Sequence, residues 1–137
     1  MLKKMLIVLP VLVLLLAACG GGGEAAPQAP TAIGDAARGE TLFKQQVIGA
    51  NASPGCITCH SLEPDVVIVG PSQAGLGARA ETRVAGLSAE EYIRQSICEP
   101  DAFVVEGFSP GLMYMNYCED LQARDVNDLI AYTLTLR

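Results

Sequence analysis

The sequence predicts an all-α fold for the part of the chain that follows an apolar N-terminal segment. Three stretches, residues 35–46, 88–99 and 122–136, combine helical start signals with apolar residues spaced three and four positions apart. That spacing places the apolar side chains on one face of a helix, where they can pack against a common core. The prediction is therefore a small helical domain with a long loop region at residues 61–86.

Each of the three predicted helices has its own signature. The first begins at Asp35 as an N-cap acid, and its Gly39 and Phe43 share a face that another helix can approach closely. The second begins with a capping box, Ser88 at the N-cap and Glu91 three residues later, and it ends before a Glu-Pro pair. The last carries an apolar stripe with Tyr132 beside it, made of Val126, Leu129, Ile130, Thr133 and Leu134.

Residues 1–18 are typical of a lipoprotein signal peptide, because two lysines precede an apolar run and small residues lead to Cys19. The run is too short for a stable transmembrane helix, which needs about 20 residues. We expect cleavage before Cys19 and a lipid on that cysteine; an ordinary secretory signal is the alternative. Residues 19–34 then form a flexible linker, and residues 35–137 form one exported domain, anchored at the outer, periplasmic face of the cytoplasmic membrane.

Cys56, Cys59 and His60 form a C-x-x-C-H motif, which predicts covalent attachment of one haem c. Two thiols three positions apart on a helical turn can reach the two vinyl groups on one porphyrin edge and form two thioethers. His60, the only histidine in the chain, then lies beneath the iron as its proximal ligand. Arg79 and Arg83 are candidate partners of the haem propionates, since arginine binds a carboxylate through two parallel hydrogen bonds.

Two other interpretations of the cysteines remain open at this point. A C-x-x-C pair can be a redox dithiol, but that function is typical of a βαβ context, which this sequence does not show. The pair can also supply half of a zinc site that Cys98 and Cys118 complete, which leaves His60 without a role. If haem takes the motif cysteines, Cys98 and Cys118 remain as an even pair in an exported protein, and we predict a disulfide between them.

The exported part of the chain is acidic. The full chain has a formal net charge of −6. Without the signal, and so without Lys3 and Lys4, seven Lys and Arg residues remain against fifteen Asp and Glu residues, and the net charge is −8. Lys44 is the only lysine that remains. This balance disfavours nucleic-acid binding and leaves no basic docking ring, so a redox partner would present a basic or an apolar surface.

The sixth ligand of the haem iron has few candidates. No second histidine exists, Lys44 lies in the first predicted helix, and the exported chain has two methionines, Met113 and Met115. A thioether is a soft iron ligand, and a His/Met pair raises the reduction potential of a haem relative to nitrogen ligands alone. The two methionines lie two positions apart, so the ligand is confined to one short loop.

The ordered motifs resemble the class I c-type cytochromes over residues 35–136. The shared features are a first helix with a glycine–aromatic face, the C-x-x-C-H motif, a Gly-Pro pair, a methionine loop and a final helix that carries Tyr132. The resemblance implies the small cytochrome c fold, in which the first and last helices cross and long loops cover one covalently bound haem.

The resemblance also implies roles for individual residues. The Pro71 carbonyl would accept the N–H of the proximal imidazole, and Met113 would be the sixth iron ligand because it follows a Gly-aromatic pair by a few residues. Tyr114 stands where the family commonly has proline, so Met115 stays as the alternative ligand.

We predict an electron carrier rather than an enzyme, because both axial positions of the iron have protein ligands and the single histidine is already used. The protein would pass single electrons between respiratory or photosynthetic complexes while anchored to the membrane. One alternative is a fixed subunit of a quinol-oxidising complex, since the chain looks similar to the mono-haem lipoprotein cytochromes of alternative complex III. A five-coordinate haem enzyme or gas sensor is a third hypothesis, and neither nucleic acid nor a small-molecule substrate is expected.

Overall fold

The computed structural model describes residues 33–137. The predicted signal peptide, Cys19 and all but the last two residues of the predicted linker lie outside this part of the chain. Across residues 33–137, no helix combines the length and the apolar character needed to cross a membrane. The elements in chain order are α1 (Ala36–Phe43), β1 (Val47–Ile48), β2 (Ser53–Pro54), η1 (Cys56–Thr58), α2 (Leu76–Ala80), α3 (Ala89–Cys98), η2 (Pro100–Ala102), α4 (Tyr117–Asp120) and α5 (Ala123–Thr135).

The helical prediction is confirmed, with one small exception. In the described part of the chain β1 and β2 form a two-stranded antiparallel sheet in which Ile48 faces Ser53. This hairpin also ends the first helix early, at Phe43 rather than at residue 46. The carbonyl of Gln46 accepts the N–H of Gly55 at 2.8 Å, so the backbone has left the helical ladder by that residue.

The later helices follow the prediction more closely. Ser88 caps α3 and Glu91 completes the capping box, while α5 begins after its N-cap Gln122. The five-residue α2 lies in residues 61–86, where only loop is predicted, because so short a helix shows too little periodicity to detect. It follows Gly75, whose φ of 70° is in the left-handed region that favours glycine.

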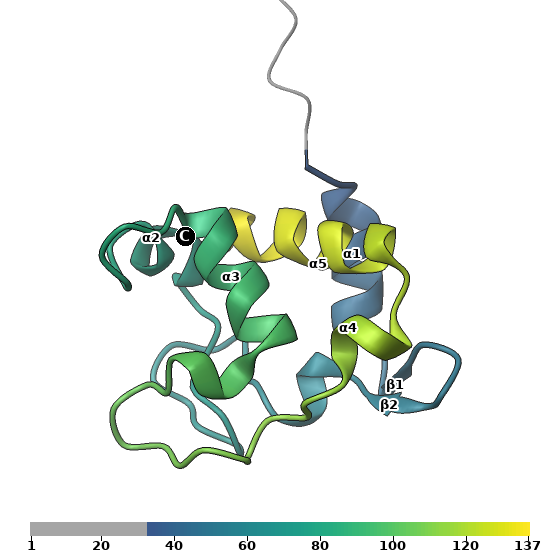
Figure 1. Ribbon diagram of the computed structural model, residues 1–137, viewed down its shortest axis with the longest axis horizontal. Helices are drawn as coiled ribbons and strands as arrows, with labels where there is room; N and C mark the ends of the chain where they lie inside the picture. Colours follow the sequence, from purple (N-terminus) through teal and green to yellow (C-terminus); the bar gives the residue numbers. More distant parts are fainter. Residues whose placement is uncertain (1–32) are drawn as a thin grey trace, which may run out of the picture.

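α1 crosses α5 at Gly39, and this crossing sets the frame of the domain (Figure 1). A Cβ atom at position 39 would lie 1.9 Å from the carbonyl oxygen of Asp128, so a glycine is needed for the helices to approach this closely. Four residues further along α1, Phe43 packs on Tyr132 with ring centroids 5.5 Å apart. The expected crossing of the first and last helices is therefore present.

An ion-pair network that the sequence patterns did not predict ties the same two helices together. The Arg38 guanidinium contacts the carboxylates of Asp125 and Asp128, and Asp128 also accepts the backbone N–H of Asp35 at 2.7 Å. Asp128 is buried, and a buried carboxylate needs such partners because an unpaired buried charge is costly. The network holds the beginning of α1 against α5.

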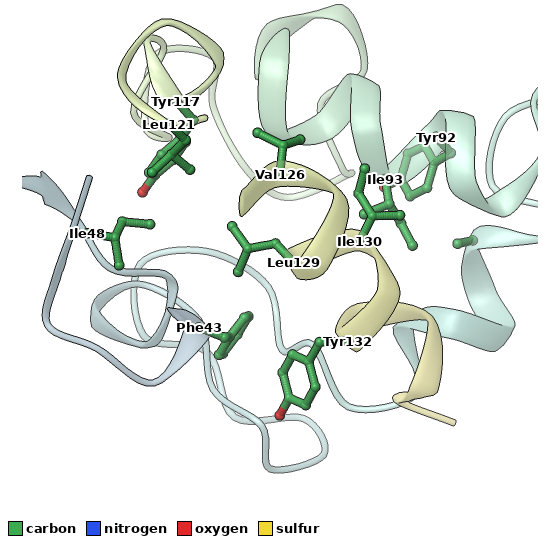
Figure 2. Close-up of a cluster of buried hydrophobic side chains, with 11 residues drawn as sticks. Phe43, Ile48, Tyr92, Ile93, Tyr117, Leu121, Val126, Leu129, Ile130 and Tyr132 are labelled. Carbon is green, nitrogen blue, oxygen red and sulfur yellow. The ribbon is translucent and has the colours of Figure 1, made fainter. Parts of the chain in front are cut away.

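The hydrophobic core is built around α5, with Leu129 and Ile130 as its most deeply buried large side chains. Figure 2 shows Phe43 of α1 and Ile93 of α3 on opposite sides of α5. In Figure 1 the long loops that follow η1 and α3 lie at the opposite end of the view from α5. The other core side chains are Ile48, Ala80, Tyr92, Tyr117, Leu121, Val126 and Tyr132.

Asp120, the last residue of α4, joins the hairpin to the segment around Met113. Its carboxylate accepts hydrogen bonds from the Tyr114 hydroxyl, from the Asn51 side chain, and from the Ser53 hydroxyl at 2.8 Å. These hydrogen bonds, of which the one from Tyr114 has the largest effect, favour the charged carboxylate over the neutral acid. They therefore hold the pKa of Asp120 below its ordinary value. A hydrogen-bonded carboxylate thus connects three separate segments of the chain.

Asp120→Asn is expected to lower the free energy of unfolding at neutral pH, because an amide accepts weaker hydrogen bonds than a carboxylate. The folded-state pKa of Asp120 is lowered, so its contribution to stability is present above the unfolded value of about 3.9 and is lost as the pH falls through the folded value. The wild-type and variant free energies should therefore converge on acidification. Denaturant unfolding followed by circular dichroism across this pH range measures the difference in free energy of unfolding between the two proteins.

The matched control for that experiment is Glu119→Gln, which removes an exposed carboxylate from the same helix. Because Glu119 carries no comparable set of hydrogen bonds, its variant should stay within about 0.5 kcal/mol of the wild type at every pH. If the loss of unfolding free energy in Asp120→Asn were as large in acid as at neutral pH, the Asp120 carboxylate would not be the source of this stability.

Candidate functional site

One cavity among the loops brings the predicted site residues together. Its walls extend from Phe43 of α1 to Leu129 and Thr133 of α5. Apolar side chains dominate its walls, among them Phe43, Ile93, Ile97, Phe103 and Leu129. The predicted site residues on the same cavity are Cys56, Cys59, His60, Pro71, Arg79 and Met113.

The C-x-x-C-H motif forms a single helical turn, η1, directly after the hairpin. The N–H groups of Cys59 and His60 both donate to the carbonyl of Cys56, at 3.2 and 2.9 Å. The Thr58 hydroxyl donates to the carbonyl of Gly55 at 2.6 Å and closes the start of the turn. The turn therefore presents two thiols and one imidazole to one cavity, as attachment of a porphyrin by two thioethers requires.

The backbone of the following loop orients His60. Its Nδ1 lies 2.8 Å from the carbonyl oxygen of Pro71, and because a carbonyl can only accept, Nδ1 carries the proton and donates it. A Cβ atom at Gly70 would lie 2.5 Å from Cε1 of the imidazole, so the loop needs glycine where it passes the ring. The N–H groups of Val69 and Gly70 donate to the Cys59 carbonyl, at 3.1 and 2.9 Å, and pin the loop to the motif.

The protonation state of His60 suits a metal ligand. Burial lowers the pKa of the imidazole, and the hydrogen bond to Pro71 opposes that effect only in part. The ring is then neutral, and with the proton on Nδ1 its Nε2 is the nitrogen with a free lone pair. His60 can therefore donate Nε2 to an iron without first losing a proton.

Gln73 is a site residue that the sequence motifs did not reveal. Its side-chain amide nitrogen lies 2.9 Å from Nδ1 of His60 and 3.4 Å from the carbonyl oxygen of Pro71. Its backbone N–H donates to the carbonyl of Ser61 at 2.8 Å, which fixes the loop around it. Because Nδ1 of His60 carries its proton, the amide nitrogen of Gln73 cannot donate to it as well; the amide donates to the carbonyl of Pro71, which is also the acceptor of the imidazole proton. A glutamine in an aperiodic loop carries no sequence signal for this position.

The two candidate methionine ligands occupy different positions. Met113 lines the cavity together with His60 and is partly buried against the core. Met115 is 45% exposed and does not contribute to the cavity wall.

A disulfide joins Cys98 to Cys118, with Cα atoms 5.1 Å apart, and closes the segment that carries both methionines. The segment is thereby anchored at both ends beside the cavity.

Arg79 and Arg83 both line the cavity and a second one that adjoins it, but their hydrogen bonding differs. Arg79 is exposed, and its guanidinium donates to the carbonyls of Ala74 and, at 2.9 Å, Ser72. Arg83 is half-buried. Within residues 33–137, its Nε is the one buried side-chain nitrogen or oxygen that has no hydrogen-bond partner.

The donor set fits a covalent haem better than the two other interpretations of the cysteines. Burial raises the pKa of the Cys56 thiol to about 12, whereas a redox dithiol needs a thiol of low pKa. Cys98 and Cys118 are bonded to each other, and residues 33–137 hold no group of three His, Cys, Asp or Glu side chains arranged for a metal ion. An apolar cavity with two cysteines, a neutral imidazole and a thioether matches a porphyrin with nitrogen and sulfur ligands to iron.

Comparison with known proteins agrees with this chemistry. No family model matches the chain. The chain is 33% identical over 121 residues to cytochrome c2 of Blastochloris viridis, in an alignment that covers 79% of this chain and 83% of that protein. The likeness thus extends over most of both proteins and well beyond a five-residue motif. The chain belongs to the class I c-type cytochromes.

Proposed function

We propose that the protein is a membrane-tethered, mono-haem electron carrier whose iron is six-coordinate. As a class I c-type cytochrome, the chain holds a covalent haem c and carries electrons instead of transforming a substrate. When bound, the haem supplies a one-electron Fe(III)/Fe(II) couple, and redox proteins are the donor and the acceptor. The observation that carries the six-coordinate assignment is the presence of His60 and Met113 on one cavity.

The chain's own residues would hold the cofactor and keep its coordination closed. Cys56 and Cys59 would form the two thioethers, and His60 would ligate the iron through Nε2 while the carbonyl of Pro71 fixes the ring. Met113 would supply the sixth ligand, and its apolar surroundings would exclude water from the iron. A coordination sphere filled by two protein ligands has no position for a substrate or a gas, which disfavours the five-coordinate enzyme and the sensor.

Met113→Ala is expected to abolish the methionine–Fe(III) charge-transfer band of the oxidised holoprotein. It should also shift the Fe(III)/Fe(II) equilibrium toward Fe(III) by at least about tenfold, which is ~59 mV for a one-electron couple. Absorption spectra and a potentiometric titration measure both effects. Met115→Ala removes the same side chain two residues away and should change neither; loss of the band in Met115→Ala alone would reassign the ligand.

A lipid on Cys19 is the proposed membrane attachment, and the sequence pattern of residues 1–19 supports it. The glycine- and proline-containing linker that follows would span roughly 20 Å as a flexible coil and about 50 Å when stretched. Such a tether would let the haem domain reach different partners near one membrane surface. More than one acyl chain is needed for firm anchoring, which a fully modified lipoprotein cysteine would provide.

Cys19→Ser is expected to move the holoprotein from the membrane fraction to the soluble periplasmic fraction of the source cell, because the lipid attachment site is lost. Fractionation followed by haem staining measures the change, and Gly20→Ala serves as the neighbouring control. A Cys19→Ser protein that stays in the membrane would contradict the lipid anchor.

Wild-type protein that elutes from mild detergent in a fixed ratio with a quinol-oxidising complex would favour the fixed-subunit alternative over a mobile carrier.

An exposed apolar run, Val66–Val69, supports contact with a redox protein. Its four side chains are 46%, 61%, 52% and 44% exposed, and consecutive exposed apolar residues mark interaction surfaces. Val69 lines the main cavity and Val67 the adjoining one, so the run lies beside the proposed cofactor. Glu63 and Asp65 precede it, and a partner with an apolar patch and a basic rim would fit this surface.

Val67→Asp is expected to slow electron exchange with the partner by about tenfold, because it places a charge in an apolar contact. The assay measures oxidation of the reduced holoprotein by membranes of the source cell. Val47→Asp is the matched control, since Val47 is 52% exposed but lies in β1 and on neither cavity. Equal oxidation rates for the two variants, with unchanged absorption spectra, would contradict the contact.

A further inference from the structure

We infer that the Cys98–Cys118 disulfide is a positioning device for the sixth iron ligand and keeps Met113 on the iron. The inference rests on the proposed six-coordinate site and adds how its methionine side is held. The bridge joins the last residue of α3 to the second residue of α4, and it encloses the whole segment that carries Met113. Opening of that segment is the motion that would take the methionine sulfur away from the iron.

Backbone hydrogen bonds hold the histidine side of the site. The N–H groups of Val69 and Gly70 donate to the carbonyl of Cys59, at 3.1 and 2.9 Å. The carbonyl of Pro71, the next residue of the same loop, accepts the imidazole proton of His60. The loop beside this ligand is thus fastened directly to the motif that contains it.

The methionine segment, residues 103–115, is fastened far less. In the described part of the chain it makes one backbone–backbone hydrogen bond, from the N–H of Phe108 to the carbonyl of Val105 at 3.1 Å. That bond is local, so it does not tie the segment to any other part of the protein. Segments with few hydrogen bonds to their surroundings open locally at low cost in free energy.

The hydrogen bonds that involve side chains act near the two ends of the bridged loop. Asp101 accepts the backbone N–H of Gly111 at 2.8 Å, and Asp120 accepts the hydroxyl hydrogen of Tyr114. Each aspartate lies within three residues of a bridge cysteine. The methionine segment is therefore held mainly through its ends, and the disulfide is the covalent bond that keeps those ends together.

The bridge connects two parts of the chain that the fold holds firmly. α3 packs on α5 and buries Ile93 in the core. In α4 the buried Tyr117 donates its hydroxyl hydrogen to the carbonyl of Pro54 at 2.7 Å, two residues before the motif begins. Both ends of the methionine segment thus have fixed supports, one on the helical frame and one beside the motif.

Chain entropy explains why the bridge disfavours loss of the ligand. The two cysteines are 20 positions apart, and while they are bonded they cannot separate when the segment opens. The opened segment then gains few conformations, whereas without the bridge it gains many more. The disulfide therefore raises the free energy of the state in which the sulfur of Met113 has left the iron.

Cyanide binding to the oxidised holoprotein measures this opening, because the anion can bind the iron only after the methionine has left. In the double variant Cys98→Ala/Cys118→Ala, cyanide should bind at least about tenfold faster than in the wild type. Replacing both cysteines leaves no unpaired thiol that could react. Absorption spectra recorded after mixing with cyanide give the rate.

The control is a variant that weakens the fold without touching the bridge or the methionine segment. Arg38→Gln breaks the ion pairs between α1 and α5, so it should lower the free energy of unfolding. Its cyanide-binding rate should nevertheless stay within about twofold of the wild type. An equal acceleration in Arg38→Gln and in the double variant would mean that the bridge supports only the overall fold.

The unaltered holoprotein tests the same bridge where the double variant fails to accumulate. Cys118 is exposed, so a water-soluble phosphine can open the S–S bond. The phosphine is oxidised to its oxide, and water supplies the oxygen and the two protons of the new thiols. Carbon monoxide should then bind the Fe(II) haem, as it does not while the bridge is intact.

Three results would overturn the inference. They are a cyanide rate in the double variant within about twofold of the wild type, an equal acceleration in Arg38→Gln, and no binding of carbon monoxide after two thiols have appeared. The methionine–Fe(III) charge-transfer band of the wild type reports separately on the proposed function. Its absence would refute Met113 as the ligand and the inference with it, whereas its presence beside any of the three results refutes the role of the bridge alone.

Discussion

The hydrogen bond from Nδ1 of His60 to the carbonyl of Pro71 is the interaction on which the rest of the site depends. It fixes one tautomer, sets the plane of the ring and leaves Nε2 as the nitrogen that can bind a metal. The chain has a single histidine, so no other side chain can replace this one. Gly70 passes the ring at a distance that no other residue would permit, and Gln73 donates to the same Pro71 carbonyl. The loop after the motif is therefore built around one imidazole.

The helical frame and the cofactor cavity share their side chains. Phe43 and Leu129 belong to the core around the α1–α5 crossing, and both also line the cavity. The closeness of that crossing depends on Gly39, because a larger residue would collide with the backbone of α5. Asp120 makes a comparable connection on the side of the methionine segment, where it binds Tyr114. Stability of the domain and geometry of the haem site are thus properties of the same contacts.

Local patterns in the sequence were sufficient for most of the fold and for the motif residues. The capping box at Ser88 and the stripe of the last helix gave α3 and α5 nearly to the residue, since both signals act within a few positions. Contacts between distant residues left no such trace. The pairing of Arg38 with Asp128, the position of Gln73 beside His60 and the unpaired Nε of Arg83 depend on how loops and helices meet in space. The five-residue α2 and the two-residue strands are too short for periodicity to identify them.

In the proposed site the iron carries two protein ligands, His60 and Met113, and serves to exchange electrons. Carbon monoxide distinguishes this closed coordination from an open one, because the gas binds Fe(II) readily only where a coordination position is open. We expect the reduced wild-type holoprotein at neutral pH to show no change in its absorption spectrum when it is exposed to carbon monoxide. Rapid, stoichiometric binding of the gas to the native protein would contradict the six-coordinate assignment and favour a ligand-binding or catalytic haem.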